Sequence, residues 1–262
     1  MHYKVFDIKP GVTLLRDRDT NIYVVEGKTS ALVIDSGYGF FDLKSQLEEI
    51  TQKPLIAVCT HGHIDHAFGG HHFDAIYMSR DELPIYQEHV TYKKYIMENH
   101  APDEKVLSRE ALEEWYRAKP KRIEFIKPGD LLDIGGNTLE IVSLRGHTPG
   151  SIGILDREHR ILFSGDGLCN YIWLQLPESS YLSEYYEVLN SLSAYGEGFD
   201  FICNGHSKEP LPAAFIDQMK TTLKDLFEGA EGKPYDNAVA SGWHYVKNGC
   251  EIMYQLDKIK KP

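Results

Sequence analysis

Three histidines and one aspartate fall within the six positions 61–66, directly after an apolar run that predicts a buried strand. His61 and His63 are two positions apart, so their rings point to the same side if the backbone stays extended. Asp65 and His66 follow a predicted turn, so their side chains point to a neighbouring position. Imidazole nitrogen and carboxylate oxygen suit zinc, with iron or manganese as alternatives, so the spacing predicts two metal positions.

A hydrogen-bonded cluster of loop histidines is the alternative interpretation of this segment, and it would be favoured for a single histidine. Four ionisable groups in six positions, however, would repel or desolvate one another without a cation. The segment therefore favours a metal site. Gly69 and Gly70, which follow it, leave room for a helix to approach the strand closely.

Three later segments also place a potential ligand after a predicted strand: Gly146-His147-Thr148-Pro149-Gly150, Ser164-Gly165-Asp166 and Asn204-Gly205-His206. In this order, the four segments resemble the signature of the metallo-β-lactamase fold hydrolases, from about Asn21 to His206. The resemblance implies an α+β fold, an αβ/βα four-layer sandwich of two related halves. Periodicity alone indicates only mixed α and β structure.

The resemblance also implies a ligand set for two zinc ions. One metal would be held by His61, His63 and His147, and the other by Asp65, His66 and His206. Asp166 would bridge both metals. Asp35, which ends another predicted strand, would brace the histidine loop from behind; a role in the turn is the compatible alternative.

Two adjacent metal ions predict hydrolytic chemistry. A hydroxide that bridges two zinc ions is the expected nucleophile, because each metal lowers the pKa of bound water. Asp65 would also shuttle a proton to the leaving group. The sequence contains no Gly-x-Ser-x-Gly segment, so a serine nucleophile is not indicated.

Length and composition predict a single domain over residues 1–262, or two closely joined halves. The net charge of −11 argues against a nucleic-acid partner. No apolar run is long enough to cross a membrane, and the first residues do not resemble a signal peptide, so we expect a cytoplasmic protein. The four scattered cysteines indicate neither disulfides nor a thiolate zinc site.

Residues 3–36 predict an antiparallel meander, and a final hairpin is expected over residues 238–256. Residues 79–127 differ in residue pattern from these strand-rich segments and predict a helical insertion over the metal cleft. Aromatic residues in and beyond it are candidates for the substrate pocket: Tyr86, Tyr92, Trp115, Tyr116, Tyr171 and Trp173. The alternative is that these rings only dock helices on the sheet.

The segment 146–151 and the short chain are similar to the glyoxalase II and lactonase branches of the family. The expected substrate is therefore a small carboxylic ester, thioester or lactone. Residues 165–168 differ from glyoxalase II, and no all-helical glutathione-binding tail is apparent. The alternatives are an iron-dependent redox member such as a persulfide dioxygenase, a phosphodiesterase, and a non-catalytic binding module. The sequence leaves the oligomeric state open.

Overall fold

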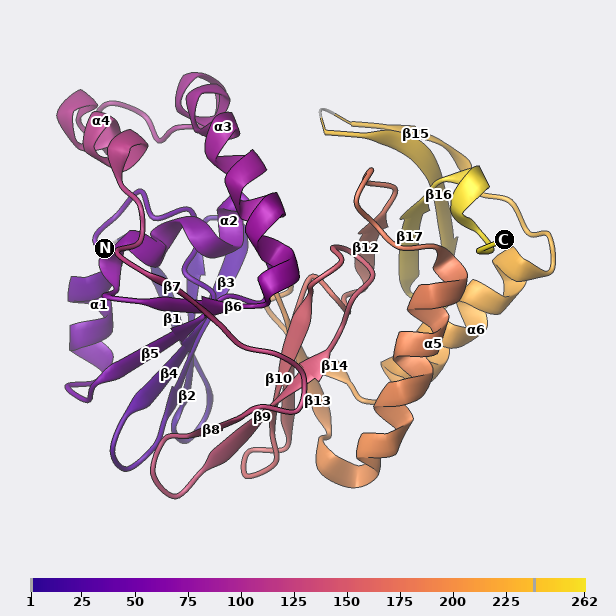
Figure 1. The fold of residues 1–262 in the computed structure, drawn as a ribbon, viewed down its shortest axis with the longest axis horizontal. Coiled ribbons are helices and arrows are strands. Elements are labelled where there is room, and N and C mark those ends of the chain that lie inside the picture. The colour runs from indigo at the N-terminus through magenta and orange to yellow at the C-terminus, as the bar shows by residue number, and fades with distance from the viewer. Residues whose placement is uncertain (1, 238) are drawn as a thin grey trace. The chain divides into compact units, whose positions relative to one another are not determined.

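The computed structural model describes residues 2–237 and 239–262 (Figure 1). It contains two compact units, unit 1 over Met1–Leu139 and unit 2 over Glu140–Pro262. Each unit combines β-sheet with helices. Among the described residues, no helix is both long and apolar enough to cross a membrane.

Unit 1 contains a seven-stranded sheet in which the strands follow one another in chain order. Its strands are β1 (Lys4–Lys9), β2 (Val12–Asp17), β3 (Thr20–Glu26), β4 (Ala31–Ile34), β5 (Leu55–Val58), β6 (Ile76–Met78) and β7 (Ile123–Phe125). The first four are antiparallel, which confirms the predicted meander. The strands from β4 to β7 are parallel, so their carboxyl ends lie at the same edge of the sheet.

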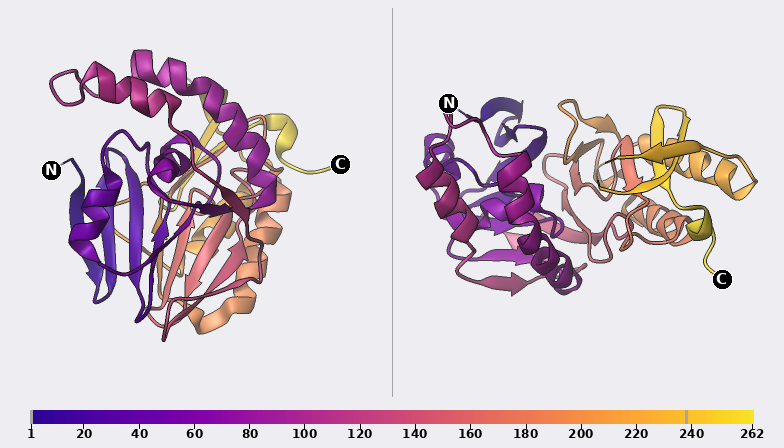
Figure 2. Two further views of the ribbon diagram at one scale, coloured as in Figure 1. Left: turned by 60° about the vertical axis from the view of Figure 1, so that its left-hand side comes forward. Right: turned by 90° about the horizontal axis from the view of Figure 1, so that it is seen from above.

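The helices of unit 1 are α1 (Leu43–Ile50), α2 (Ile64–Ala67), η1 (Phe68–His72), η2 (Arg80–Glu82), α3 (Leu83–Asn99) and α4 (Arg109–Arg117). Residues 79–127 thus hold two α-helices, which pack side by side (Figure 2), and also the edge strand β7. The prolines at 102 and 120 both lie outside these two helices.

A buried lysine joins α3 to the end of α4. Lys93 Nζ donates hydrogen bonds of 2.7 Å to the carbonyl oxygens of Trp115 and Ala118, which lie in and just after the last turn of α4. Burial lowers the pKa of Lys93 to about 8. Trp115 is 2% exposed, donates from Nε1 to the Tyr38 carbonyl at 2.7 Å and packs 4.4 Å from the Phe40 ring. The ring of Trp115 therefore docks α4 on the body of unit 1.

The strands of the second half form two sheets. The six-stranded sheet has the order β14 (Leu211–Pro212), β13 (Phe201–Asn204), β11 (Ile161–Gly165), β10 (Ile152–Asp156), β9 (Thr138–Ser143) and β8 (Leu131–Asp133). The four-stranded sheet has the order β12 (Tyr171–Leu174), β17 (Cys250–Tyr254), β16 (Ser241–Lys247) and β15 (Lys233–Asp236). The predicted final hairpin is β16 and β17, joined through Asn248 and Gly249, both at positive φ. Its expected first residue, at position 238, lies outside the described residues.

The helices of unit 2 are α5 (Leu182–Leu192), η3 (Ser193–Gly198), α6 (Phe215–Phe227) and η4 (Leu256–Lys258). α5 and α6 share one hydrophobic core with both sheets. Its buried members include Leu144, Leu162, Ile172, Tyr185, Leu223 and Ile252. This core fixes the loops that carry the polar residues of unit 2.

Candidate metal centre

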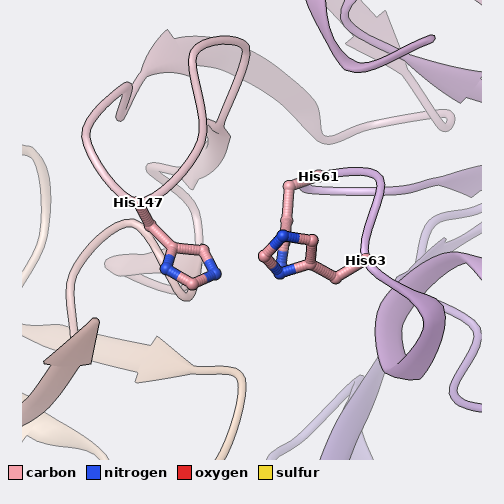
Figure 3. A group of neighbouring side chains, drawn as sticks. All are labelled: His61, His63 and His147. Atoms are coloured by element: carbon pink, nitrogen blue, oxygen red, sulfur yellow. The ribbon is translucent and has the colours of Figure 1, made fainter. Parts of the chain in front are cut away.

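Unit 1 gathers four ligand-type side chains, His61, His63, Asp65 and His66, which we call the loop cluster. His61 and His63 project from the loop between β5 and α2 (Figure 3), with ring centroids 4.6 Å apart. The His66 ring lies 4.2 Å from that of His61, and its Nε2 is 3.4 Å from Asp65 Oδ2. The loop leaves the sheet at the edge where the parallel strands β4 and β5 end.

Asp35, directly after β4, orients two of these histidines. Its carboxylate accepts from the backbone N and the hydroxyl of Thr60, at 2.7 and 2.9 Å, and lies 2.8 Å from His66 Nδ1. Because Thr60 donates its only hydroxyl proton to Asp35, it accepts from His61 Nδ1, 3.1 Å away. Both rings then carry a proton on Nδ1, so Nε2 is the atom of each that suits a metal.

The backbone at Asp35 has a φ of +62°, in the left-handed region that aspartate tolerates better than most residues. The three hydrogen bonds to its carboxylate oppose the cost of this conformation. A second threonine, Thr20 at the start of β3, donates to Asp65 Oδ2 at 3.2 Å. Thr20, on β3, thus holds Asp65, whereas Thr60, in the loop after β5, holds Asp35.

Unit 2 gathers three further side chains, His147, Asp166 and His206, which we call the strand-end cluster. Asp166 follows β11 and His206 follows β13; because these strands are parallel, both residues emerge at one edge. His206 Nε2 lies 3.0 Å from Asp166 Oδ2. Asn204 Oδ1 accepts from the backbone N of His206 at 3.0 Å, in a tight turn that presents the imidazole.

His147 projects from the loop after β9 (Figure 3) and lies close to Asp166. Its Nε2 is 3.8 Å from Asp166 Oδ2, and its Nδ1 donates to the Trp173 carbonyl at 2.8 Å. Gly146 is required beside it, because a Cβ there would lie 2.4 Å from the ring of Tyr185. The hydrogen bond to Trp173 again makes Nε2 the atom that suits a metal.

The donors of both clusters suit divalent transition metals. Each offers imidazole nitrogen together with carboxylate oxygen, and neither includes a thiolate. Three of the five imidazoles have Nδ1 fixed by a hydrogen bond. In His66 and His147, Nε2 then lies 3.4 and 3.8 Å from a carboxylate oxygen of the same cluster. Imidazoles oriented by a hydrogen bond at Nδ1 beside a carboxylate are characteristic of metal sites.

Residues 15–206 match the family model of the metallo-beta-lactamase superfamily. The chain belongs to this superfamily. All seven residues of the two clusters lie within the matched range.

Curated relatives of the chain in the superfamily include thioester hydrolases. The acyl-coenzyme A thioesterase MBLAC2 of Gallus gallus is 29% identical over 180 residues, covering 63% of each chain. The acyl-coenzyme A thioesterase MBLAC2 of Homo sapiens is 28% identical, covering 63% of this chain and 64% of that relative. The hydroxyacylglutathione hydrolase GloC of Haemophilus influenzae is 29% identical over 55% of this chain and 63% of its own. The chain thus aligns with less than two thirds of the length of these relatives.

Solved structures of the superfamily share the fold. A metallo-beta-lactamase from Pontibacter korlensis has a TM-score of 0.60 at 17% identity, covering 85% of this chain and 99% of its own. A beta-lactamase domain protein from Burkholderia ambifaria has a TM-score of 0.61 at 18% identity, covering 90% and 82%. The expected α+β fold class of this superfamily is confirmed.

Four of the aromatic pocket candidates, Trp115, Tyr92, Tyr171 and Trp173, differ in their surroundings. Trp115 is buried in the core of unit 1, as the docking alternative predicts. Tyr92 on α3 is 44% exposed and donates to Glu88 at 3.0 Å. Tyr171 and Trp173 lie on β12. The Trp173 carbonyl contacts the strand-end cluster, because it accepts the hydrogen bond from His147 Nδ1. Partial burial, and to a lesser degree a 2.6 Å hydrogen bond with Tyr235, raise the pKa of Tyr171 to about 12.

The expected role of the glycines after the loop cluster is seen at Gly70 but not at Gly69. Both lie in the 3₁₀ helix η1, and a Cβ on Gly70 would lie 3.0 Å from the Ile76 side chain on strand β6. A Cβ on Gly69 would lie 1.9 Å from the carbonyl oxygen of Ser36, so its close neighbour is instead the loop after β4. His71, which follows, hydrogen-bonds through Nδ1 to the Phe68 carbonyl at 2.9 Å, and burial lowers its pKa to about 4. The four cysteines are buried, and none of them forms a disulfide among the described residues.

Several residues that hold the clusters were not identified from the sequence. Thr60 was detectable, because it directly precedes His61 in the chain. Thr20 and the Trp173 carbonyl carry no sequence signal, since they reach the clusters only through strand pairing. Glu82 and His89, in the helical insertion, were likewise missed.

Proposed function

We propose that this chain is a metal-dependent hydrolase that cleaves a thioester between an acyl group and a small thiol. The observation that carries the proposal is the fixed orientation of His61, His66 and His147, whose Nδ1 atoms are all engaged by protein acceptors. Such orientation is what a metal ligand requires, and an ordinary surface histidine does not need it.

The proposed ligand set joins the two clusters around two zinc ions, with iron or manganese as alternatives. One ion would take His61, His63 and His147; the other would take Asp65, His66 and His206; Asp166 would bridge them. The order of these residues within the family match supports this assignment. The mixture of nitrogen and oxygen donors supports zinc.

When bound, the metal ions would supply a hydroxide nucleophile at neutral pH and polarise the substrate carbonyl. Asp35 and Thr60 keep two histidines in the tautomer that this requires. Asp65, held by Thr20, would pass a proton to the leaving group. A thiol leaving group has a pKa of about 8.5, so it needs this proton less than an alcohol does.

A thioester is favoured over an oxygen ester or lactone because the curated relatives named above are thioester hydrolases. Acyl-coenzyme A and hydroxyacylglutathione are therefore the first substrates to test. Tyr92, Tyr171 and Trp173 stay candidates for contacts with the acyl or thiol portion.

The test combines metal analysis with turnover. Protein purified without added metal would be analysed for zinc, iron and manganese. Hydrolysis of acyl-coenzyme A and acyl-glutathione would then be followed by thiol release, and hydrolysis of oxygen-ester and lactone substrates by release of acid. We expect zinc and preferential release of thiol, both lost in Asp166→Ala. Stoichiometric iron with oxygen uptake and no hydrolysis would overturn the proposal.

A further inference from the structure

The start of the helical insertion lies in backbone contact with the loop cluster of unit 1. A Cβ on Gly62 would lie 2.8 Å from the carbonyl oxygen of Glu82 and 2.8 Å from the backbone N of Tyr86. Real Cβ atoms do not approach other atoms so closely. The insertion can therefore reach this loop only because position 62 is glycine.

Glu82 uses this approach to hold the loop. Its side chain is fully buried, and Oε2 accepts a 2.7 Å hydrogen bond from the backbone N of Gly62, between His61 and His63. Burying a carboxylate is costly unless it accepts hydrogen bonds, and such bonds to a charged acceptor are short and strong. The hydrogen bond from Gly62 thus explains why the Glu82 carboxylate can be buried.

His89 holds the same loop two helical turns later, on the same face of α3. Its Nδ1 accepts from the backbone N of Ile64 at 3.2 Å. Its ring stacks on that of His63, with centroids 4.4 Å apart and planes 15° from parallel. His89 therefore supports both the backbone next to His63 and the imidazole itself.

These contacts form a regular series. Alternate backbone N–H groups of the loop, at Thr60, Gly62 and Ile64, each donate to a side chain from another element: Asp35, Glu82 and His89. An extended chain that leaves its sheet loses its ladder partners, and its amides need other acceptors. The three side chains supply these acceptors on the amides that flank His61 and His63.

We propose that Glu82 and His89 are positioning residues for the metal site, and that the insertion sets metal affinity by holding the loop before metal binds. The inference rests on the proposed function only in that His61 and His63 bind metal. It gives the insertion a task distinct from covering the substrate.

Glu82→Leu and Glu82→Gln form the main test. Leucine keeps volume but removes the acceptor, whereas glutamine retains one. In competition with a chromophoric chelator, zinc should bind Glu82→Leu on the order of 10–100-fold more weakly than the parent. Glu82→Gln should recover most of that affinity. In metal-free protein, hydrogen–deuterium exchange at Gly62 should be faster in Glu82→Leu only.

His89→Phe is a second, independent variant, because it preserves the stacked ring and removes only the acceptor. Exchange at Ile64 should be faster in this variant, with a smaller loss of zinc affinity than in Glu82→Leu. The matched control is Ser108→Ala, which removes the side-chain cap of α4 and loosens the insertion away from the loop. This control should leave zinc affinity and exchange at Gly62 unchanged.

Parental zinc affinity and exchange in both Glu82→Leu and His89→Phe would overturn the inference. Equal losses in Ser108→Ala would overturn it too, because Glu82 would then act only through the stability of the insertion. If no form of the protein bound zinc, the proposed function would fail, while exchange in the metal-free protein would still decide whether the loop is held. His89→Phe provides that decision should Glu82→Leu not fold.

Discussion

The loop cluster and the strand-end cluster use the same kinds of side chain but are built in opposite ways. The loop cluster takes four residues from six consecutive positions. The strand-end cluster takes His147, Asp166 and His206 from three separate loops, brought together by the pairing of β11 with β13 and by β12. One is organised by local sequence, and the other by strand register.

The supporting residues follow the same division. The loop cluster is held by side chains: Asp35, Thr60, Thr20, Glu82 and His89. The strand-end cluster is held mainly by backbone, through the Trp173 carbonyl and the parallel strand ends. Single substitutions can therefore remove the supporting side chains of the loop cluster one at a time. In the strand-end cluster, the largest effects should come from substituting the ligand-type residues themselves.

The largest effect should come from Asp166, which lies within 3.0 and 3.8 Å of both histidines of its cluster. If Asp166 bridges two metals, Asp166→Ala removes a ligand and a negative charge from each. We expect hydrolysis to be abolished and bound metal to fall. Metal content after dialysis against a weak chelator, with turnover in parallel, measures this.

The matched variant is His206→Ala, which would strip a ligand from one metal only. It should retain about one metal per chain with impaired turnover. If Asp166→Ala instead kept both metals and normal turnover, the bridging role would be wrong.

Asp35→Asn should have the next largest effect, because Asp35 orients residues of the loop cluster but is not itself a proposed metal ligand. An asparagine can accept from Thr60, but its NH₂ group cannot accept from His66 Nδ1, so the His66 tautomer is no longer fixed. Metal affinity should fall on the order of 10–100-fold while binding persists. Competition with a chelator measures this loss; affinity equal to that of the parent would show that Asp35 only shapes the turn.

A smaller effect concerns the stability of unit 1. Burial raises the pKa of Asp17 to about 6, although the hydrogen bond from the Tyr38 backbone N lowers it in part. The unfolded carboxyl has a pKa of about 3.9, so the folded chain binds the additional proton between about pH 4 and 6. The stabilisation from Asp17 is therefore complete below that window and is lost as pH rises through it.

Asp17→Asn should remove this contribution to the pH dependence of the free energy of unfolding. Denaturant titrations of parent and variant from pH 4 to 7 would compare the slopes, since other titrating groups are common to both proteins. Identical slopes would contradict a raised pKa at Asp17.

The smallest expected effect is that of reductant. The four cysteines are buried and form no disulfide among the described residues, and burial raises the pKa of the Cys59 and Cys169 thiols well above its usual value. Thermal unfolding of metal-free protein should be the same with and without a phosphine reductant, which does not bind zinc as thiols do. A large fall in melting temperature would reveal a disulfide that supports either unit.

The sequence predicted the loop cluster well because its information is local. His61 and His63 share a side through simple strand geometry, and the antiparallel meander before them follows from alternating apolar residues and turn signals. The fold class, in contrast, came from family resemblance, because periodicity cannot determine how strands are ordered in a sheet.

The supporting contacts could not be predicted in the same way. Thr20 and Asp65 are 45 positions apart, and Glu82 lies in a charged segment whose composition suggests a solvated surface. Its burial depends on the close approach that Gly62 permits, which no pattern in the neighbouring residues reveals. Trp115 shows the converse, since its aromatic character did not distinguish docking from substrate contact.

The pairing of β12 with β17 has a consequence for synthesis on the ribosome. β12 is an edge strand whose partner begins at Cys250, 76 positions after Leu174. At roughly 5–20 residues per second, translation delays that pairing by about 4–15 seconds. Until β17 emerges, the carbonyl that orients His147 has no sheet to hold it, so the nascent chain completes its first cluster well before its second.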